Sequence, residues 1–319
     1  MNVRLVQLDG SLPNLALMKL AHWHRSKGDY VHRAQSIHPT MFEPQWDKVY
    51  GSAIFKFSQV AVKQFKQEWP EGLLGGTGTD SLTTVEQLIG TEYEHYDYAD
   101  YPDVEYSIGF TQRGCRLSCK FCVVPKKEGK PRSVNTIADI WRGEGHPKHL
   151  HILDNDFYGN PDWKLRLAEI RDGNFKVCMS QGINVRLINQ EAAEALASIQ
   201  YRDKKFSRPT LYTAWDNIGD ERIFFKGVEL LNNAGIPSKH LRAYMLIGYD
   251  PKETWERIWY RFNKMVEAGI EPYPMVFDRS RIDLICFQRW VISGIYRFVK
   301  WPDYKRQTKS AESVEAYPQ

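Results

Sequence analysis

The stretch EYSIGFTQRGCRLSCKFC, residues 105–122, joins an apolar strand pattern directly to a loop with three cysteines. Cys115, Cys119 and Cys122 have the spacing C-x3-C-x2-C, so their thiolates can converge on one soft metal centre, as in iron–sulfur clusters. The chain holds five cysteines, and an odd number with three so close together favours metal binding over a disulfide framework. The stretch therefore predicts a metal-binding loop at the carboxyl end of a strand.

Beyond this loop, strand patterns alternate with helical patterns along the chain. The expected strands are 105–110, 149–153, 176–180, 210–214, 242–247 and 274–277, and the expected helices between them are 136–141, 163–171, 190–199, 220–233 and 254–268. Such alternation implies a parallel sheet. Since these units are too few for a closed eight-stranded barrel, we expect an α/β fold with a partial (β/α)6 barrel over residues 101–288.

Polar side chains follow the expected strands of this barrel. They include Asp154, Asn155 and Asp156 after the second strand, Asn184 and Arg186 after the third, and Asp216 after the fourth. In βα barrels the carboxyl ends of the strands form the active-site face. This arrangement predicts a polar ligand above the barrel.

The loop CRLSCKFC, preceded by Gly114 and with Phe121 before its last cysteine, resembles the signature loop of the radical S-adenosylmethionine (SAM) superfamily. The resemblance covers residues 104–280. It implies that Cys115, Cys119 and Cys122 hold a [4Fe-4S] cluster whose fourth iron binds SAM. One electron, from a donor such as flavodoxin or ferredoxin, would cleave SAM to methionine and a 5′-deoxyadenosyl radical. That radical would abstract hydrogen from a substrate that the sequence does not identify.

The resemblance also implies ligand-binding roles for the strand ends. Asp154, Asn155 and Asp156 stand where the family has a Gly-Gly-Glu-like motif that receives the SAM amino group. The glycines are absent here, but carboxylates remain as acceptors. Asn184 and Arg186 would reach the ribose and carboxylate of SAM, Asp216 would face SAM or substrate, and Phe121 completes this set of cofactor-binding residues.

A zinc site is the alternative from a different functional class. Zinc in structural sites takes four ligands, often three cysteines and a histidine. His146, His149 and His151 lie downstream, but His149 and His151 flank an expected strand 27 or more residues beyond Cys122, unlike the ligands of compact zinc fingers. A non-catalytic zinc or iron–sulfur binding protein thus remains a second hypothesis. Cys178 and Cys286 are predicted to be ordinary buried cysteines.

Residues 1–100 are predicted to form a small Rossmann-like α/β domain. The expected strands are 3–8, 30–34, 48–55 and 72–74, with a helix from Leu17 towards Gly28 and a connection to the next domain at 91–101. The domain resembles a shortened cobalamin-binding domain, with Gly75 and Gly76 where small residues lie near the corrin tail. The Asp-x-His-x-x-Gly motif that supplies a cobalt ligand is absent, so we expect a degenerate domain that does not retain cobalamin. A cobalamin-dependent radical methyltransferase remains the alternative.

The C-terminal region, the net charge and the start of the chain give the remaining predictions. Residues 289–319 are predicted to form a C-terminal helix, which closes the open barrel edge, and a disordered tail from residue 305. The net charge of +4 neither indicates nor excludes nucleic acid as a partner. There is no apolar run of about 18 residues and no signal-peptide pattern at the start, so we expect no membrane association and a cytoplasmic protein.

Overall fold

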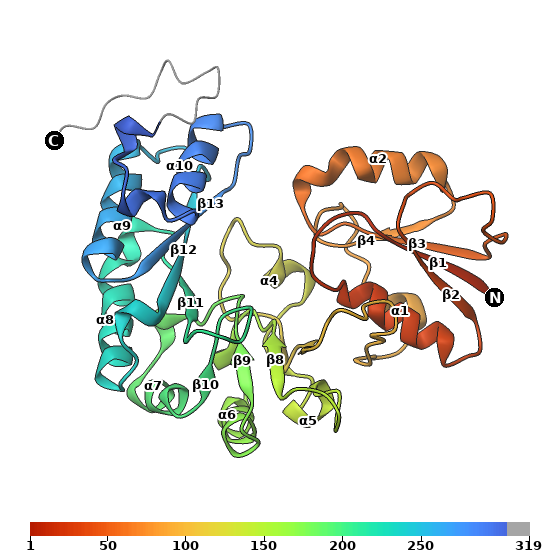
Figure 1. The fold of residues 1–319 in the computed structure, drawn as a ribbon, viewed down its shortest axis with the longest axis horizontal. Helices are drawn as coiled ribbons and strands as arrows, with labels where there is room; N and C mark the ends of the chain where they lie inside the picture. Colours follow the sequence, from red (N-terminus) through yellow and green to blue (C-terminus); the bar gives the residue numbers. More distant parts are fainter. Residues whose placement is uncertain (305–319) are drawn as a thin grey trace. The chain divides into compact units, whose positions relative to one another are not determined.

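The computed structural model describes residues 1–304 and divides the chain into two compact units (Figure 1). The first unit is Met1–Glu105 and the second begins at Tyr106. Both are α/β, and all strand pairs within the described residues are parallel except one short pair, β6 with β7. The predicted disordered tail lies outside the described residues.

The first unit contains one four-stranded parallel sheet in the order β2-β1-β3-β4. Its strands are β1 (Asn2–Gln7), β2 (Tyr30–Ala34), β3 (Lys48–Ser52) and β4 (Leu73–Gly75). Each lies within two residues of a strand expected from the sequence, except that β3 ends earlier. The central strand β1 is buried along most of its length, as expected for a strand with neighbours on both sides.

Helices cover both faces of this sheet. One face packs on α1 (Leu15–Arg25) and α3 (Val85–Ile89), and the other packs on α2 (Gln59–Glu68), whose Phe65 is fully buried. Asn14 caps α1 by accepting a bond from the Leu17 N–H at 3.3 Å. The sequence pattern predicted α1 but not α2 or α3, because neither of these two helices has a wide apolar stripe.

The acidic, tyrosine-rich segment 91–101 belongs to the first unit and is not a free connection. Glu94 pairs with Lys19 at 2.7 Å, and Asp97 and Asp100 pair with Arg25 at 2.7 and 2.9 Å. Both basic residues lie on α1. The unusual composition of the segment therefore serves its attachment to that helix.

The second unit contains the six parallel strands that the βα rhythm predicts. They are β5 (Ser107–Gly109), β8 (His149–Ile152), β9 (Lys176–Cys178), β11 (Leu211–Ala214), β12 (Leu241–Ile247) and β13 (Glu271–Val276). They are divided between two sheets, with the strand orders β10-β9-β8-β5 and β11-β12-β13. The first sheet also contains β10 (Gln200–Tyr201), a short strand that was not predicted. No closed barrel forms within the described residues.

The two sheets of this unit adjoin between β9 and β11. The Ile183 N–H, just beyond β9, donates to the Tyr212 carbonyl of β11 at 2.7 Å. The Tyr244 hydroxyl of β12 donates to the Ser180 carbonyl at 2.5 Å. The carboxyl ends of β9, β11 and β12 therefore follow one another along a common edge.

Helices cover one face of these two sheets and bury their apolar side chains in a single core (Figure 1). They are α5 (Ile137–Ile140), α6 (Trp163–Asp172), α7 (Gln190–Ala197), α8 (Glu221–Asn233) and α9 (Trp255–Glu267). Each lies within two residues of its expected range. Thr136, Asn189 and Thr254 cap α5, α7 and α9 with their side chains, which explains where these helices begin.

The C-terminal helix differs from its prediction. Helix α10 runs from Ile282 to Ile292, so it begins before residue 289 and ends well before the expected tail at 305. Short 3-10 turns follow at Ile295–Arg297 and Trp301–Asp303. They pack aromatic rings on α9 and α10, for example Trp301 on Trp290 at 5.5 Å. Among residues 1–304 no helix is long and apolar enough to cross a membrane.

Candidate metal centre

The cysteine loop lies within a small hairpin that the sequence analysis missed. Strands β6 (Gln112–Arg113) and β7 (Arg132–Ser133) pair antiparallel and close the loop between them, which also contains α4 (Val124–Lys127). Gly114 has φ +87°, and a Cβ there would lie 2.3 Å from the Lys130 carbonyl, so only glycine fits. The Gly114 N–H donates to Glu128 at 3.0 Å. The hairpin therefore holds the loop immediately before Cys115.

The three loop thiols are half-buried and interact with one another. Burial raises the pKa of Cys115 and of Cys122, and the neighbouring cysteines raise both further. The Leu117 N–H donates to Cys115 Sγ at 3.4 Å. Hydrogen bonds from backbone N–H groups to cysteine sulfur are among the features that tune iron–sulfur clusters. The loop is thus a set of neighbouring thiols with one sulfur already accepting a backbone bond.

The chemistry of these donors fits an iron–sulfur cluster better than zinc. Within the described part of the chain, no three His, Cys, Asp or Glu side chains are grouped closely enough to hold a metal, so the thiols must approach further to bind either. Three cysteines suffice for a cluster with one open iron, whereas structural zinc needs a fourth ligand. His151 does not offer it, since its Nε2 bonds Ser180 Oγ at 2.6 Å. His149 stacks on Phe206 at 4.6 Å.

Asp154 and Asp156 both accept hydrogen bonds from the protein itself, and their role as acceptors for a ligand amino group stays a prediction. Asp154 is buried and accepts the N–H groups of Thr111 and Gln112 at 2.7 and 3.1 Å, and also the Thr111 hydroxyl. Burial raises its pKa to about 7. Asp156 is 1% exposed and binds Arg116, next to Cys115, through Nε and Nη2 at 2.8 Å and through the backbone N–H at 3.0 Å.

The remaining predicted residues after β8 and β9 make fewer hydrogen bonds with the rest of the protein. Asn155 is half-buried and makes no side-chain hydrogen bond with any described residue. Asn184 accepts a bond from Arg186 Nε at 3.1 Å, and Arg186 Nη1 pairs with Asp220 at 2.6 Å. Arg186 therefore presents a partly neutralised guanidinium to this edge of the sheet, rather than a free one.

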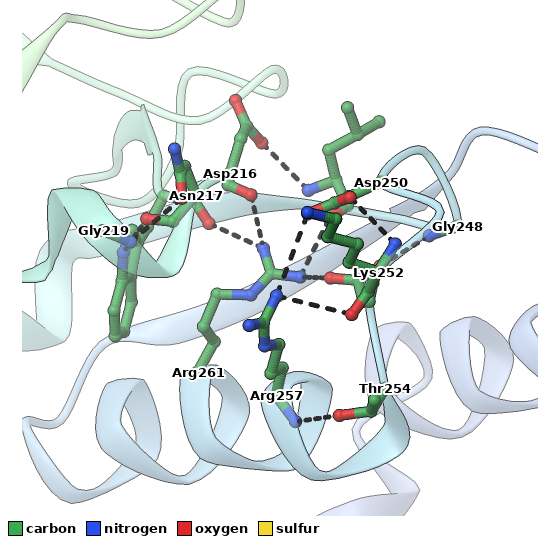
Figure 2. Close-up of polar contacts among 12 residues, drawn as sticks. Asp216, Asn217, Gly219, Gly248, Asp250, Lys252, Thr254, Arg257 and Arg261 are labelled. Carbon is green, nitrogen blue, oxygen red and sulfur yellow. Dashed lines mark hydrogen bonds and ion pairs between the residues drawn. The ribbon is translucent and has the colours of Figure 1, made fainter.

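Asp216 lies at the end of β11 above a buried arginine (Figure 2). Its Oδ1 accepts the Leu246 N–H at 2.9 Å. Beneath it, Arg261 donates to the carbonyls of Trp215, Asp216 and Leu246 at 3.0–3.1 Å and pairs with Glu253. Burial raises the pKa of Asp216, whereas Arg261 and Arg186 lower it. Arg261 was not predicted, because a single arginine on the apolar face of α9 gives no signal of its own in the sequence.

Asp216 and Phe121 connect the cysteine loop with the ends of the second sheet. Asp216 is close enough to Cys122 to raise the pKa of that thiol. The Phe121 ring contacts Tyr249, beyond β12, edge to face at 5.4 Å, and Tyr249 contacts Phe277, beyond β13, at 4.9 Å. The loop after β5 therefore lies beside the carboxyl ends of β11, β12 and β13. Tyr249 and Phe277 were not among the predicted site residues, although Tyr249 lies two residues beyond the expected strand 242–247 and Phe277 ends the expected strand 274–277.

The glycines of the first unit serve backbone packing. Gly76 has φ +103°, and a Cβ there would lie 2.0 Å from the Ala53 carbonyl oxygen. A Cβ on Gly78 would lie 2.5 Å from the Phe55 carbonyl oxygen. The loop after β4 is thus small because it lies against residues 53–55. Backbone packing thus accounts for Gly76 and Gly78, and the absence of cobalamin stays a prediction.

The two cysteines outside the loop differ from each other. Cys178 on β9 is fully buried, as predicted, and burial raises its pKa to about 12. Cys286 on α10 is only half-buried, so the prediction of a buried thiol was wrong there.

Comparison with known proteins adds no assignment. No protein-family model matches the chain, and neither curated proteins nor solved structures give a match. The candidate centre therefore stands on the residues and contacts described above.

Proposed function

We propose that this protein is a radical SAM enzyme, in which a [4Fe-4S] cluster on Cys115, Cys119 and Cys122 supports reductive cleavage of SAM. The observation that carries the proposal is the position of the C-x3-C-x2-C loop. It follows the first of six parallel strands and lies beside the carboxyl ends of the later ones, through Phe121 and Cys122. We further propose that the two sheets of the second unit form the partial (β/α)6 barrel of this family and that the first unit is Rossmann-like.

The described residues divide the work at this centre. The three thiolates would hold the cluster. When bound, the cluster would supply one electron to the sulfonium of SAM, and cleavage of the C5′–S bond would give methionine and a 5′-deoxyadenosyl radical. The ion pair between Arg116 and Asp156 attaches the cysteine loop to the segment that follows β8. Phe121, Tyr249 and Phe277 form a row of contacting aromatic rings beside the loop, and we propose that this row lowers the polarity of the site.

The electron donor is proposed to be an acidic protein such as flavodoxin or ferredoxin. Four exposed basic residues lie in or just after the cysteine loop: Lys120, Lys126, Lys130 and Arg132. Basic residues near a redox centre accelerate association with an acidic partner. We propose a cytoplasmic location, where such donors and reduced thiols are found.

An activity measurement tests this function directly. The chain is purified and reconstituted without oxygen, then incubated with SAM and a strong reductant. We expect about four irons per chain and formation of 5′-deoxyadenosine. A colourless protein that binds one zinc would favour the non-catalytic alternative. Formation of S-adenosylhomocysteine, dependent on added cobalamin, would favour the methyltransferase.

A further inference from the structure

The helix-covered face of the second unit carries a groove that the candidate metal centre does not use. Helices α8 and α9 lie side by side there (Figure 1), and a groove of about 970 Å³ runs between them. Phe225 of α8 and Ala268 of α9 line this groove. At one end, Glu221 of α8 accepts the Tyr260 hydroxyl of α9 at 2.9 Å and pairs with Lys264 at 3.9 Å. The charges of Glu221 and Lys264 are therefore used within the chain.

Four other charged side chains along this groove have no partner within residues 1–304. They are Arg222, Lys226 and Glu229 on α8 and Glu267 on α9, all of them exposed. None of the four makes a hydrogen bond or an ion pair with another described residue. Two are cations and two are anions, so together they add no net charge to this face. Two copies of such a face do not repel each other, as two copies of a face with charges of one sign would.

The other side of α8 is held against the core, which fixes the direction of the charged stripe. A Cβ at Gly227 would lie 2.1 Å from the Val185 carbonyl oxygen, so the backbone of α8 is in close contact with the segment after β9. Arg222, Lys226 and Glu229 share a different side of the helix, because residues three, four and seven apart lie on one face. The stripe is therefore presented outward on a rigid support.

The order of the charges along α8 is self-complementary. Arg222 and Glu229 are about two turns apart, with Phe225 and Lys226 midway between them. A second α8 that crosses antiparallel at this midpoint brings Arg222 opposite the partner's Glu229, and Glu229 opposite the partner's Arg222. The same crossing brings Lys226 opposite the partner's Phe225, which places a cation beside an aromatic ring. A twofold axis makes each of these contacts twice.

We infer that this chain forms a twofold-symmetric dimer, in which α8 of one copy packs antiparallel on α8 of the other along the groove beside α9. A parallel crossing would bring each charge opposite its own copy, so the charges select the antiparallel one. Ile223 lies beside the stripe and is 45% exposed, so the second copy also covers apolar surface there. The inference does not depend on the proposed function.

The test reverses charges in the reconstituted full chain and measures its mass by analytical ultracentrifugation over a range of concentrations. We expect the wild type to be a dimer that dissociates on dilution. Arg222→Glu and Glu229→Arg each place two pairs of like charges across the axis, so each should weaken dimerisation by roughly 100-fold or more. The matched control is Arg289→Glu, which reverses an exposed arginine on α10 and should dimerise as the wild type does.

An equimolar mixture of the two groove variants tests the antiparallel geometry itself. When one copy carries Arg222→Glu and the other carries Glu229→Arg, both contacts again join opposite charges, so we expect the mixture to dimerise. Restored dimerisation also shows that both variants are folded. A wild-type chain that stays monomeric at every concentration would leave the groove to a different protein and overturn the inference. Variants that dimerise as the wild type does, or a mixture that stays monomeric, would also overturn it.

Discussion

Arg116 and Asp156 form a two-pronged ion pair that joins the cysteine loop to the end of β8. Both bonds are 2.8 Å, and Asp156 Oδ2 also accepts the Arg116 backbone N–H at 3.0 Å. A Cβ at Gly159 would lie 2.4 Å from that same oxygen, so the neighbouring turn needs glycine. Asp156 thus determines where the residue after Cys115 lies, although it is far from the cysteines in sequence.

Replacing Asp156 by Ala is expected to impair cluster retention. The variant loses charge-assisted hydrogen bonds to Arg116. Such bonds stabilise a buried site by about 1.5–3 kcal/mol each, and the stabilisation is smaller here because Arg116 is partly exposed. The loop then loses its attachment to β8. We expect lower iron content and weaker visible absorbance after reconstitution. The control is Asp172→Ala, which breaks an exposed pair with Arg171. Equal iron in both variants would contradict this role.

Asp154 predicts a pH dependence of stability. Its folded pKa is about 7 against an ordinary value of 3.8, because burial disfavours the charged form. The folded state therefore binds a proton more tightly than the unfolded chain, and stability falls as the pH rises from about 4 to about 7. At about 1.4 kcal/mol per unit, the loss is on the order of 4 kcal/mol.

Asp154→Asn removes this dependence and keeps the contacts. The amide oxygen accepts the Thr111 and Gln112 N–H groups, and the amide NH2 donates to the Thr111 hydroxyl. Thermal unfolding between pH 4 and pH 8 is the measurement. We expect the melting temperature of Asp154→Asn to fall less than that of the wild type, and to exceed it above pH 7. Parallel curves for the two proteins would contradict the assignment.

The elements of the second unit were predictable because local patterns determine them. Strands such as 149–152 and helices such as 163–172 have apolar side chains at the correct period, with polar ends. The division of the strands into two sheets was not predictable, because it depends on contacts between β9 and β11 that no local pattern encodes. Helices α2 and α3 were missed for a similar reason, since tertiary packing stabilises them.

The candidate site was predictable in its positions and not in its partners. The sequence placed Asp154, Asp156 and Asp216 correctly at strand ends. Whether each carboxylate meets a ligand or the protein depends on Thr111, Arg116 and Leu246, which are distant from them in sequence. The buried Arg261 became visible only once α9 packed under β11 and β12.

Replacing Cys119 by Ala tests the cluster ligands. One of the three thiolates is then missing, so we expect both the iron content and the formation of 5′-deoxyadenosine to fall by about 10-fold or more. Cys178→Ala is the control, since that thiol is fully buried on β9 and its pKa of about 12 keeps it protonated. It should keep both properties close to wild type. Similar losses in the two variants would refute the assignment of the loop.

Gly76→Ala is expected to destabilise the first unit without affecting iron. The added Cβ would lie 2.0 Å from the Ala53 oxygen at φ +103°, so backbone strain adds to overpacking of about 1–3 kcal/mol. Gly28→Ala is the matched control, because its φ is +81° and nothing lies within 4 Å of the new Cβ. That control should cost only about 1 kcal/mol of strain. Thermal unfolding and iron content of both variants are the measurements.

Because Gly76 is needed for packing, loss of cobalamin in a Gly76 variant would not identify a corrin site. A Gly76→Ala protein as stable as Gly28→Ala would show that the loop after β4 does not lie against residues 53–55.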